Sequence, residues 1–290
     1  MTVGVLVMAY GSPAGPEDVE AYYTHIRRGR PPTDEQLADL RRRYEAVGGI
    51  STLRARTDAQ AAALQRALGD GYRVVLGMKH ATPFIEDAVA TLGDCDRAVG
   101  LVLAPHHSAL SVGEYLDRAA SAAPVPFTGI ESWATLPAYV AFLAGAVGDA
   151  LAPMPPGTKV LFTAHSLPAR ILETGDRYPD EVRATADAVA AAAGLDRWAG
   201  YATAWQSAGR TPEPWLGPDV LEVIDAADTG LVVCPCGFVS DHLEVAYDLD
   251  IEAAAAAAGK GIPFARTRVL NDDAATFAAL AERVREAACG

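Results

Sequence analysis

The sequence lacks the features of membrane and exported proteins. No apolar run reaches the ~18 residues that a membrane-spanning helix needs, and no basic residue precedes the apolar segment at 3–10 as it does in an export signal. Four cysteines in 290 residues are too few for a disulfide scaffold. We therefore expect a cytoplasmic protein with reduced thiols and no membrane insertion.

Positive charge is also scarce. The 24 Lys and Arg residues stand against 37 Asp and Glu, a net charge of −13, which argues against nucleic acid and anionic membranes as partners. The sequence contains no GxGxxG, GxxxxGK(S/T), GxSxG or HExxH pattern. Dinucleotide-binding, P-loop, hydrolase and zinc-protease functions thus lack their fingerprints.

Apolar residues make up 50% of the chain, and short apolar segments alternate with segments of helical period. Strands are expected at 3–10, 72–79, 98–105, 159–166, 198–207 and 230–237. Helical spacing is clearest at 57–68, 137–152, 242–259 and 272–288. This strict alternation of apolar strands and helices predicts an α/β fold with parallel sheets covered on both faces.

The chain also contains an internal repeat. VLVMAYGSP (5–13) matches VLFTAHSLP (160–168) at an offset of 155, and LVLAPHH (101–107) matches LVVCPCG (231–237) at an offset of 130. The alternative is a chance match between apolar strands. The repeat predicts two similar halves joined at a proline-rich linker (152–158), with domains at 1–151 and 152–270 and a C-terminal helix within 271–290.

Two such halves predict a binding site between them, because parallel sheets bind ligands beyond the carboxyl ends of their strands. Tyr10 and His165 occupy the same repeat position and should lie on opposite walls of this cleft. A histidine at the end of a strand can titrate near neutral pH or bind a metal. A histidine that is merely hydrogen-bonded there would have the same sequence signature.

Three carboxylates, those of Glu244, Asp248 and Glu252, are spaced at i, i+4 and i+8 and would share one face of a helix. Like charges at this spacing cost about 0.2–0.5 kcal/mol per pair. An acidic helix start capped by Ser240 explains Asp241 and Glu244 but not Glu252. A cation explains all three, since carboxylates suit hard divalent ions and carboxylate with imidazole suits Fe(II).

Arginines are concentrated near the N-terminus, at Arg27, Arg28, Arg30, Arg41, Arg42 and Arg43. Guanidinium groups pair with carboxylates in fork geometry, and tyrosines at 22, 23, 44 and 115 add aromatic surface with polar tips. For Arg28, Arg41 and Arg42 the alternative is a solvent-facing helix surface. Together with the acidic residues, this pattern predicts a flat or extended ligand with several carboxylates beside a divalent metal.

Eight segments carry a family resemblance: VLVMAYGSP, YYTHIRRGR, RYEAVGGIS, GMKHATPFIEDAV, LAPHHSALS, TAHSLP, WQSAGRTPEPWLGPDV and GFVSDHLEVAYDLD. In order and spacing they resemble the ferrochelatases, from residue 4 to about residue 252. The resemblance implies a chelatase-like fold of two Rossmann-like domains with parallel four-stranded sheets flanked by helices. The domains would face each other across a porphyrin cleft, with the C-terminal helix packed back on the body.

Within this family the chain most resembles the soluble bacterial coproporphyrin III ferrochelatases. The segment from Gly48 to Leu53 leads directly into the helix at 57–68, without the hydrophobic lip of membrane-associated relatives. The resemblance implies insertion of Fe2+, as a substrate, into coproporphyrin III to give coproheme for haem b, with no required cofactor. The alternatives are a protoporphyrin IX ferrochelatase, another tetrapyrrole metal chelatase, and a non-catalytic porphyrin or haem carrier.

The resemblance also implies roles for single residues. His165 and Glu244 match the metal-insertion pair, and Tyr10 matches the tyrosine that faces the porphyrin iron from the other side. The positions that match contacts to the tetrapyrrole or its propionates are Arg27, Arg43, Tyr44, Ser51 and Tyr115. Asp248 and Glu252 match an outer divalent-metal site that could take Mg2+.

The chain departs from its relatives in a few places. Cys236 stands where an aliphatic residue is usual, and His107 where an aromatic residue is common. Some actinobacterial relatives hold an iron–sulfur cluster through several cysteines of a C-terminal extension. In that region this chain has only one cysteine, Cys289. Cys234 and Cys236 would point to opposite faces of a continued strand, and neither is obviously near Cys95. We expect buried thiols, no cluster and a monomer.

Overall fold

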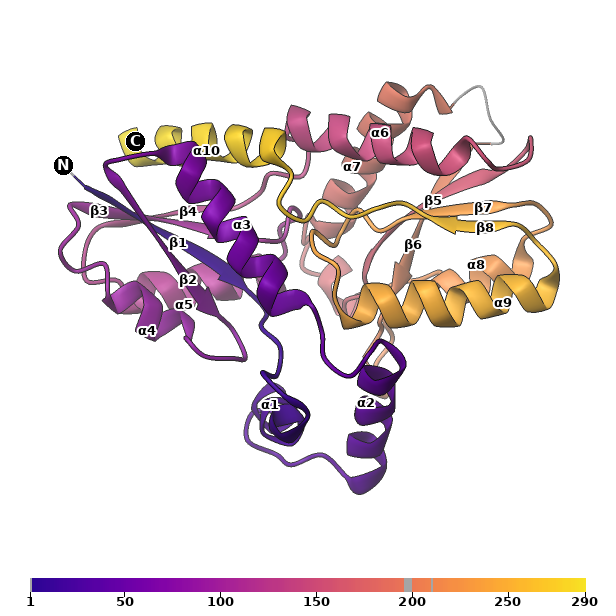
Figure 1. Cartoon of the computed structure of the whole chain (residues 1–290), viewed down its shortest axis with the longest axis horizontal. Coiled ribbons are helices and arrows are strands. Elements are labelled where there is room, and N and C mark those ends of the chain that lie inside the picture. Colours follow the sequence, from indigo (N-terminus) through magenta and orange to yellow (C-terminus); the bar gives the residue numbers. More distant parts are fainter. Residues whose placement is uncertain (1, 196–199, 210) are drawn as a thin grey trace.

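The structure is a computed structural model that describes residues 2–195, 200–209 and 211–290. It contains two parallel four-stranded sheets, with strand orders β2-β1-β3-β4 and β6-β5-β7-β8. The strands are β1 (Val3–Ala9), β2 (Tyr72–Met78), β3 (Arg97–Val102), β4 (Phe127–Ile130), β5 (Lys159–His165), β6 (Tyr201–Gln206), β7 (Leu231–Cys234) and β8 (Phe264–Arg266). The predicted α/β fold with two Rossmann-like halves is confirmed (Figure 1). Part of the strand expected at 198–207 lies outside the described residues.

The helices are α1 (Val19–Ile26), α2 (Asp34–Ala46), α3 (Leu53–Leu68), α4 (Ile85–Ala90), α5 (Glu114–Ala122), α6 (Pro137–Leu151), α7 (Tyr178–Ala193), α8 (Val220–Ala226), α9 (Ala254–Lys260) and α10 (Ala274–Cys289). The described residues also include two 3-10 turns, η1 (Pro16–Asp18) and η3 (Ala169–Leu172), and two π-helices, η2 (Ala109–Gly113) and η5 (Val245–Ala253). Local sequence explains several boundaries. Thr33 and Gln36 form a capping box at the start of α2, and Gly194 ends α7 in a left-handed conformation.

The central strand of each sheet is buried on both faces. Val5 and Val7 of β1 pack in the cluster that contains α3 and α10, whereas Leu6 and Met8 pack against α4 and α5. The strand β5 behaves in the same way, with α6 and α7 on one side and α8 and α9 on the other. This burial explains the continuous apolar runs, since a strand covered on both faces needs apolar residues at every position.

Two helices pack on the sheet of the other half. Helix α6 follows β4 in the chain but packs against α7, β7 and β8, and α10 ends the chain but packs against α3, β3 and β4. Figure 1 shows α10 above the first sheet and α6 above the second. A single core cluster therefore joins the halves, with Val5, Leu143, Phe162 and Phe277 among its members. The division at residues 151 and 270 stays a prediction.

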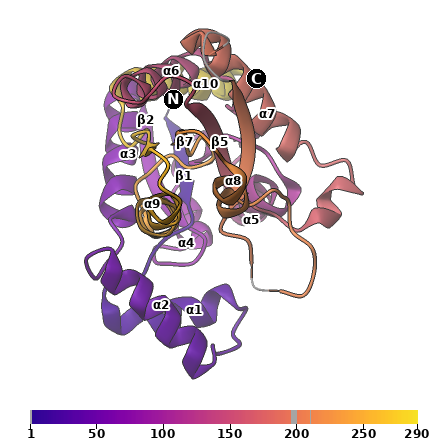
Figure 2. The ribbon, with the colours of Figure 1, turned by 90° about the vertical axis from the view of Figure 1, so that its right-hand side faces the viewer.

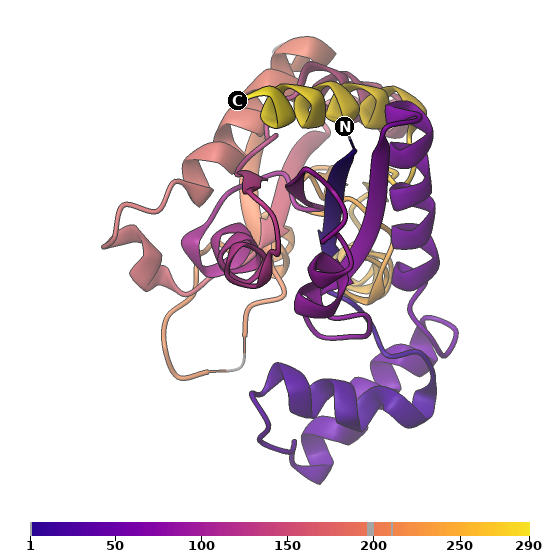
Figure 3. The same ribbon diagram turned by 90° about the vertical axis from the view of Figure 1, so that its left-hand side faces the viewer.

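The helices α1 and α2 form a hairpin that projects from the body on the side opposite to α6 and α10 (Figures 2 and 3). A small cluster of Val19, Leu37, Leu40 and Tyr44 holds the hairpin together, and Leu243 of the second half packs against it. Across the described ranges, no helix has the length and apolarity that crossing a membrane requires.

Candidate active site

A cavity of about 1200 Å³ lies where the carboxyl ends of both sheets meet. Its walls come from the loops after β1, β2, β3, β5, β6 and β7, and from the hairpin of α1 and α2. This is the position expected for a ligand of parallel sheets. The volume exceeds that of most sites for drug-sized ligands, which take roughly 300–1,000 Å³, so the cavity has room for a large ligand.

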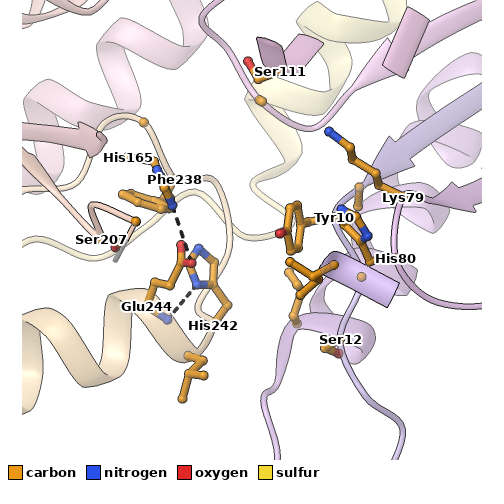
Figure 4. Close-up of a pocket in the computed structure, with 18 of the residues that line it drawn as sticks. Tyr10, Ser12, Lys79, His80, Ser111, His165, Ser207, Phe238, His242 and Glu244 are labelled. Carbon is orange, nitrogen blue, oxygen red and sulfur yellow. Dashed lines mark hydrogen bonds and ion pairs between the residues drawn. The ribbon is translucent and has the colours of Figure 1, made fainter. Parts of the chain in front are cut away.

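His165 and Glu244 face each other on one wall (Figure 4), with His165 Nε2 at 3.7 Å from Glu244 Oε1. His165 Nδ1 lies 2.5 Å from the carbonyl oxygen of Ser166. Because a carbonyl oxygen can only accept, Nδ1 carries the hydrogen and donates it. A neutral His165 therefore keeps the lone pair of Nε2 on the side of Glu244, where it can accept a proton or bind a metal.

Glu244 directly precedes the π-helix η5, so the helix predicted over 242–259 is present, with its 245–253 part π-helical. In a π-helix each N–H bonds to the fifth preceding carbonyl, which widens the turn, and such segments are frequent at functional sites. The carboxylates of Glu244, Asp248 and Glu252 nevertheless all line the cavity. The predicted shared face is thus kept although the helix type differs.

Arg43 relieves the repulsion between these carboxylates. Its Nη1 lies 3.4 Å from Asp248 Oδ1, its Nη2 lies 3.9 Å from Glu252 Oε1, and its guanidinium stacks over the Tyr247 ring at 4.6 Å. The Ser207 hydroxyl donates to Asp248 Oδ2 at 2.5 Å. Burial raises the pKa of Asp248 to about 7, against the opposing effects of Ser207 and Arg43. Within the described ranges, no cluster of three or more His, Cys, Asp or Glu residues could hold a metal.

Tyr10 lies on the wall opposite His165, as the repeat predicts (Figure 4). It follows β1, and its ring packs against the His80 ring with a centroid distance of 4.6 Å. Tyr10 is 43% exposed and lines the cavity. Desolvation and the nearby Glu244 raise the pKa of Tyr10, so its hydroxyl is neutral at physiological pH.

The other predicted ligand contacts separate into two groups. Tyr44, Ser51 and Tyr115 line the cavity and are buried. Arg27 donates from Nε to the carbonyl oxygen of Arg30 at 3.2 Å. The described residues that form the cavity walls include the neighbouring Arg28 but not Arg27. The role of Arg27 therefore stays a prediction, and the solvent-facing alternative for Arg28 is only half right, because this exposed residue also lines the cavity.

Sequence reasoning gave no role to Lys79, His80, Arg118 or His242, all of which line the cavity. Lys79 and His80 directly follow β2, which pairs with β1. Their position one strand away from Tyr10 was the available signal, because the carboxyl ends of paired parallel strands meet at one edge. His242 Nδ1 accepts from the backbone N–H of Glu244 at 3.1 Å, which holds the backbone of Glu244 in place.

The cysteines lie away from the cavity walls or deep in the core. The strand β7 ends at Cys234 and the chain turns, with Cys236 N donating to the Cys234 carbonyl oxygen at 2.8 Å. The expectation of opposite faces is wrong, because residues two apart in a strand share a face, and both cysteines lie in one core cluster. Burial raises the pKa of Cys234 to about 12 and keeps it a thiol. Cys95 is buried and Cys289 is exposed, and all four are free.

The burial of His106 leads us to expect a lower free energy of unfolding in acid. It is 2% exposed, its Nε2 contacts Thr185 Oγ1 at 2.9 Å, and burial lowers its pKa to about 3. Between about pH 6.5 and this value the unfolded chain binds the proton and the folded chain does not, so stability falls as pH falls, by up to about 1.4 kcal/mol per pH unit. Urea denaturation at pH 7, 6 and 5 gives the free energy of unfolding at each pH. This free energy should fall less steeply with falling pH in His106→Gln than in the unsubstituted protein. An unchanged slope would contradict this role.

The sequence model of the ferrochelatase family matches residues 2–288. The chain belongs to the ferrochelatase family. This ferrochelatase is 44% identical to the coproporphyrin III ferrochelatase of Halalkalibacterium halodurans over 93% of this chain and 92% of that protein. It is 43% identical to the coproporphyrin III ferrochelatase of Geobacillus kaustophilus over 98% and 95% of the two chains. The resemblance read from the motifs, and with it a metal chelatase enzyme, is confirmed.

Two solved structures share the fold of this ferrochelatase. SirB from Bacillus subtilis with Fe3+ superposes with a TM-score of 0.58 at 13% identity, over 99% of this chain and 96% of SirB. CbiX, described as the terminal enzyme of sirohaem biosynthesis in denitrifying bacteria, gives a TM-score of 0.55 at 18% identity over 99% of both chains. At such identities the likeness shows the fold alone, and it agrees with the predicted chelatase-like architecture.

Proposed function

We propose that this ferrochelatase inserts Fe2+ into coproporphyrin III, forming coproheme on a route to haem b. The observation that carries the proposal is the pair of His165 and Glu244, which faces Tyr10 across a cavity with room for a tetrapyrrole. The pair offers a lone pair and a carboxylate to an incoming cation. The high identity to proteins named coproporphyrin III ferrochelatases supports the choice of substrate.

The cationic side chains of the walls, rather than their net charge, favour a substrate with many carboxylates, because six carboxylates also line the cavity, those of Asp39, Glu114, Asp219, Glu244, Asp248 and Glu252. Four cationic side chains line the cavity, those of Arg28, Arg43, Lys79 and Arg118. Coproporphyrin III carries four propionates, whereas protoporphyrin IX carries two and has vinyl groups in place of the others. Guanidinium and ammonium groups bind carboxylates through charge-assisted hydrogen bonds, so the substrate with more carboxylates gains more contacts here.

The proposed mechanism uses each side of the cleft. Closure of the walls on the macrocycle would bend it out of plane, and strain of this kind is typically about 1–5 kcal/mol. The bend exposes the lone pairs of the pyrrole nitrogens to the metal. Fe2+ would exchange its water for His165 Nε2 and the Glu244 carboxylate. Once Fe2+ passes to the pyrrole nitrogens, the Nε2 lone pair of a neutral His165 is free again and is the natural first acceptor of a pyrrole proton.

Asp248 and Glu252 are proposed as an outer divalent-metal site. Mg2+ usually keeps several waters and binds one or two carboxylates, so the donor set fits a hydrated Mg2+. Arg43 contacts both carboxylates in this structure. A cation at this position and the guanidinium therefore compete for the same oxygens.

This competition predicts opposite effects of Arg43→Met on two ligands. Mn2+, used as a Mg2+ analogue, should bind about 10-fold more tightly, equivalent to about 1.4 kcal/mol, because the guanidinium no longer neutralises the carboxylates. Coproporphyrin III should bind about 10-fold more weakly because a propionate partner is lost. Electron paramagnetic resonance of free Mn2+ and quenching of porphyrin fluorescence measure these affinities without turnover.

Arg42→Met is the matched control for this prediction, since Arg42 is exposed and pairs with Asp39 at 2.7 Å outside the contacts that Arg43 makes with η5. It should leave both affinities within about 2-fold. Weaker Mn2+ binding in Arg43→Met would show that the guanidinium supports the outer site rather than blocking it.

The proposed function is tested by anaerobic incubation of the protein with Fe2+ and either coproporphyrin III or protoporphyrin IX, followed by loss of porphyrin fluorescence. Rapid loss with coproporphyrin III alone is the expected result. Equal rates with both porphyrins would favour the broader tetrapyrrole chelatase. Tight porphyrin binding without insertion of Fe2+, Co2+ or Zn2+ would favour a porphyrin or haem carrier and would remove the roles given to His165 and Glu244.

A monomeric state and a cytoplasmic location stay predictions. Light scattering coupled to size-exclusion chromatography should give a mass near the 30.3 kDa of one chain. A mass of twice this value would show a dimer.

A further inference from the structure

A second pair of histidines lies on the wall opposite His165. His80 follows β2 and His25 belongs to α1, and their Nδ1 atoms are 2.9 Å apart. The His80 ring packs on Tyr10 with a centroid distance of 4.6 Å, and the His25 ring stacks on Phe84 at 5.0 Å. Both histidines line the cavity, and His25 is also exposed to solvent. Figure 4 shows His80 next to Tyr10, across the cavity from His165.

The short distance restricts this pair to tautomers in which one Nδ1 donates to the other, and the relay below uses the one in which His80 Nδ1 carries the hydrogen. Two imidazole nitrogens at 2.9 Å form a hydrogen bond only when one carries the hydrogen and the other accepts it. This bond uses the Nδ1 atom of each ring and leaves each Nε2 free. His80 lines the cavity beside Tyr10 and His25 is exposed to solvent, so Nε2 is the atom of each ring left for exchange with the cavity and the solvent. Such a pair can take up a proton at one end and release another at the other end.

The surroundings of His80 favour transfer over storage of a proton. Burial, together with Lys79, His25 and Arg118, lowers the pKa of His80 to about 3. His80 is therefore neutral at physiological pH and can accept a proton at Nε2. It will not hold that proton, because the same surroundings disfavour its charged form.

The proposed reaction needs two proton acceptors, because Fe2+ displaces two pyrrole protons. His165 and Glu244 serve one face of a macrocycle bound between the walls, and Tyr10 lies on the other side. We propose that His80 and His25 form a proton exit for the pyrrole proton released on the Tyr10 side of the cavity. This inference rests on the proposed insertion of a metal into a porphyrin.

The transfer is a relay without redox change. The pyrrole N–H bond breaks and its proton moves to His80 Nε2, directly or through one water, while the electron pair stays on the pyrrole nitrogen and binds the iron. The hydrogen on His80 Nδ1 moves to His25 Nδ1, and His25 releases the hydrogen on Nε2 to water. After the product leaves, exchange with water on both sides restores the starting tautomers.

The variant His25→Gln separates a relay from a positioning role. Glutamine can keep a hydrogen bond to His80 but cannot pass a proton on. A relay predicts single-turnover insertion of Fe2+ about 10-fold slower, with unchanged affinity for coproporphyrin III. Proton transfer by a positioned side chain is worth roughly 10²–10⁴-fold, and water at this exposed position would replace part of it. Added imidazole should restore the rate of His25→Ala, and the solvent deuterium isotope effect should rise in both variants.

The control is His107→Ala, because the described part of the cavity wall includes His25 and His80 but not His107. Its rate should equal that of the unsubstituted protein. A normal rate in His25→Gln, or a slow rate in His25→Ala that imidazole does not restore, would overturn the relay and leave His25 with a positioning role. Failure of the unsubstituted protein to insert Fe2+ would instead overturn the proposed function, so the two failures are distinguishable.

Discussion

The variant His165→Ala should insert Fe2+ into coproporphyrin III roughly 10²–10⁴-fold more slowly than the unsubstituted protein, the range typical for loss of a positioned proton acceptor. The Ser166 carbonyl oxygen holds the hydrogen on Nδ1, so Nε2 presents its lone pair on the side of Glu244. Alanine removes this lone pair as metal ligand and as base. Coproporphyrin III should still bind with nearly unchanged affinity, because the arginines on the walls remain. Stopped-flow fluorescence measures the rate of Fe2+ insertion and the affinity for coproporphyrin III separately.

His165→Asn is the matched variant, since an amide N–H can still donate to the Ser166 carbonyl oxygen but offers no basic nitrogen. It should be as slow as His165→Ala. Near-normal turnover in either variant would remove His165 from the insertion site. Loss of porphyrin binding in His165→Ala would show that the residue acts on the substrate instead of the metal.

The variant Phe277→Ala should lower the free energy of unfolding by about 3–5 kcal/mol, the usual cost of removing a large core side chain. Phe277 lies in α10, is 1% exposed and belongs to the cluster that joins both halves. The melting temperature should fall by an amount on the order of 10 °C. Because the cluster is shared, calorimetry should show one transition that moves as a whole.

Leu172→Ala is the control for this variant, because Leu172 is 58% exposed and lies outside the core clusters of the described residues. It should change stability by no more than about 0.5 kcal/mol. Two separate transitions, of which only one moves in Phe277→Ala, would contradict a core shared between the halves.

Periodicity located three strands of each sheet but not the fourth. The strands β4 and β8 have only 4 and 3 residues and are partly exposed at sheet edges. Such short edge strands lack the continuous apolar run of a strand buried on both faces. The sequence pattern around 127–130 and 264–266 therefore carried no strand signal, and the four-stranded sheets were expected only from the family resemblance.

The sequence by itself determined the α/β class, the repeat, the cleft and the opposition of Tyr10 and His165. These features depend on local patterns, because burial of a strand on both faces shows in its own apolar residues and ligands of parallel sheets bind beyond the carboxyl ends of the strands. The acidic face of 244–252 was also readable, since a spacing of four residues keeps side chains close on a helix of either type.

Only the tertiary structure decided which distant side chains meet. His25 and His80 are 55 residues apart in the chain and Arg43 and Asp248 are 205 apart, yet both pairs lie within hydrogen-bond distance. The choice of Arg28 over Arg27 at the wall, and the packing of α6 and α10 on the sheets of the opposite halves, also belong here. Such contacts depend on how whole elements pack, and no local spacing encodes that arrangement.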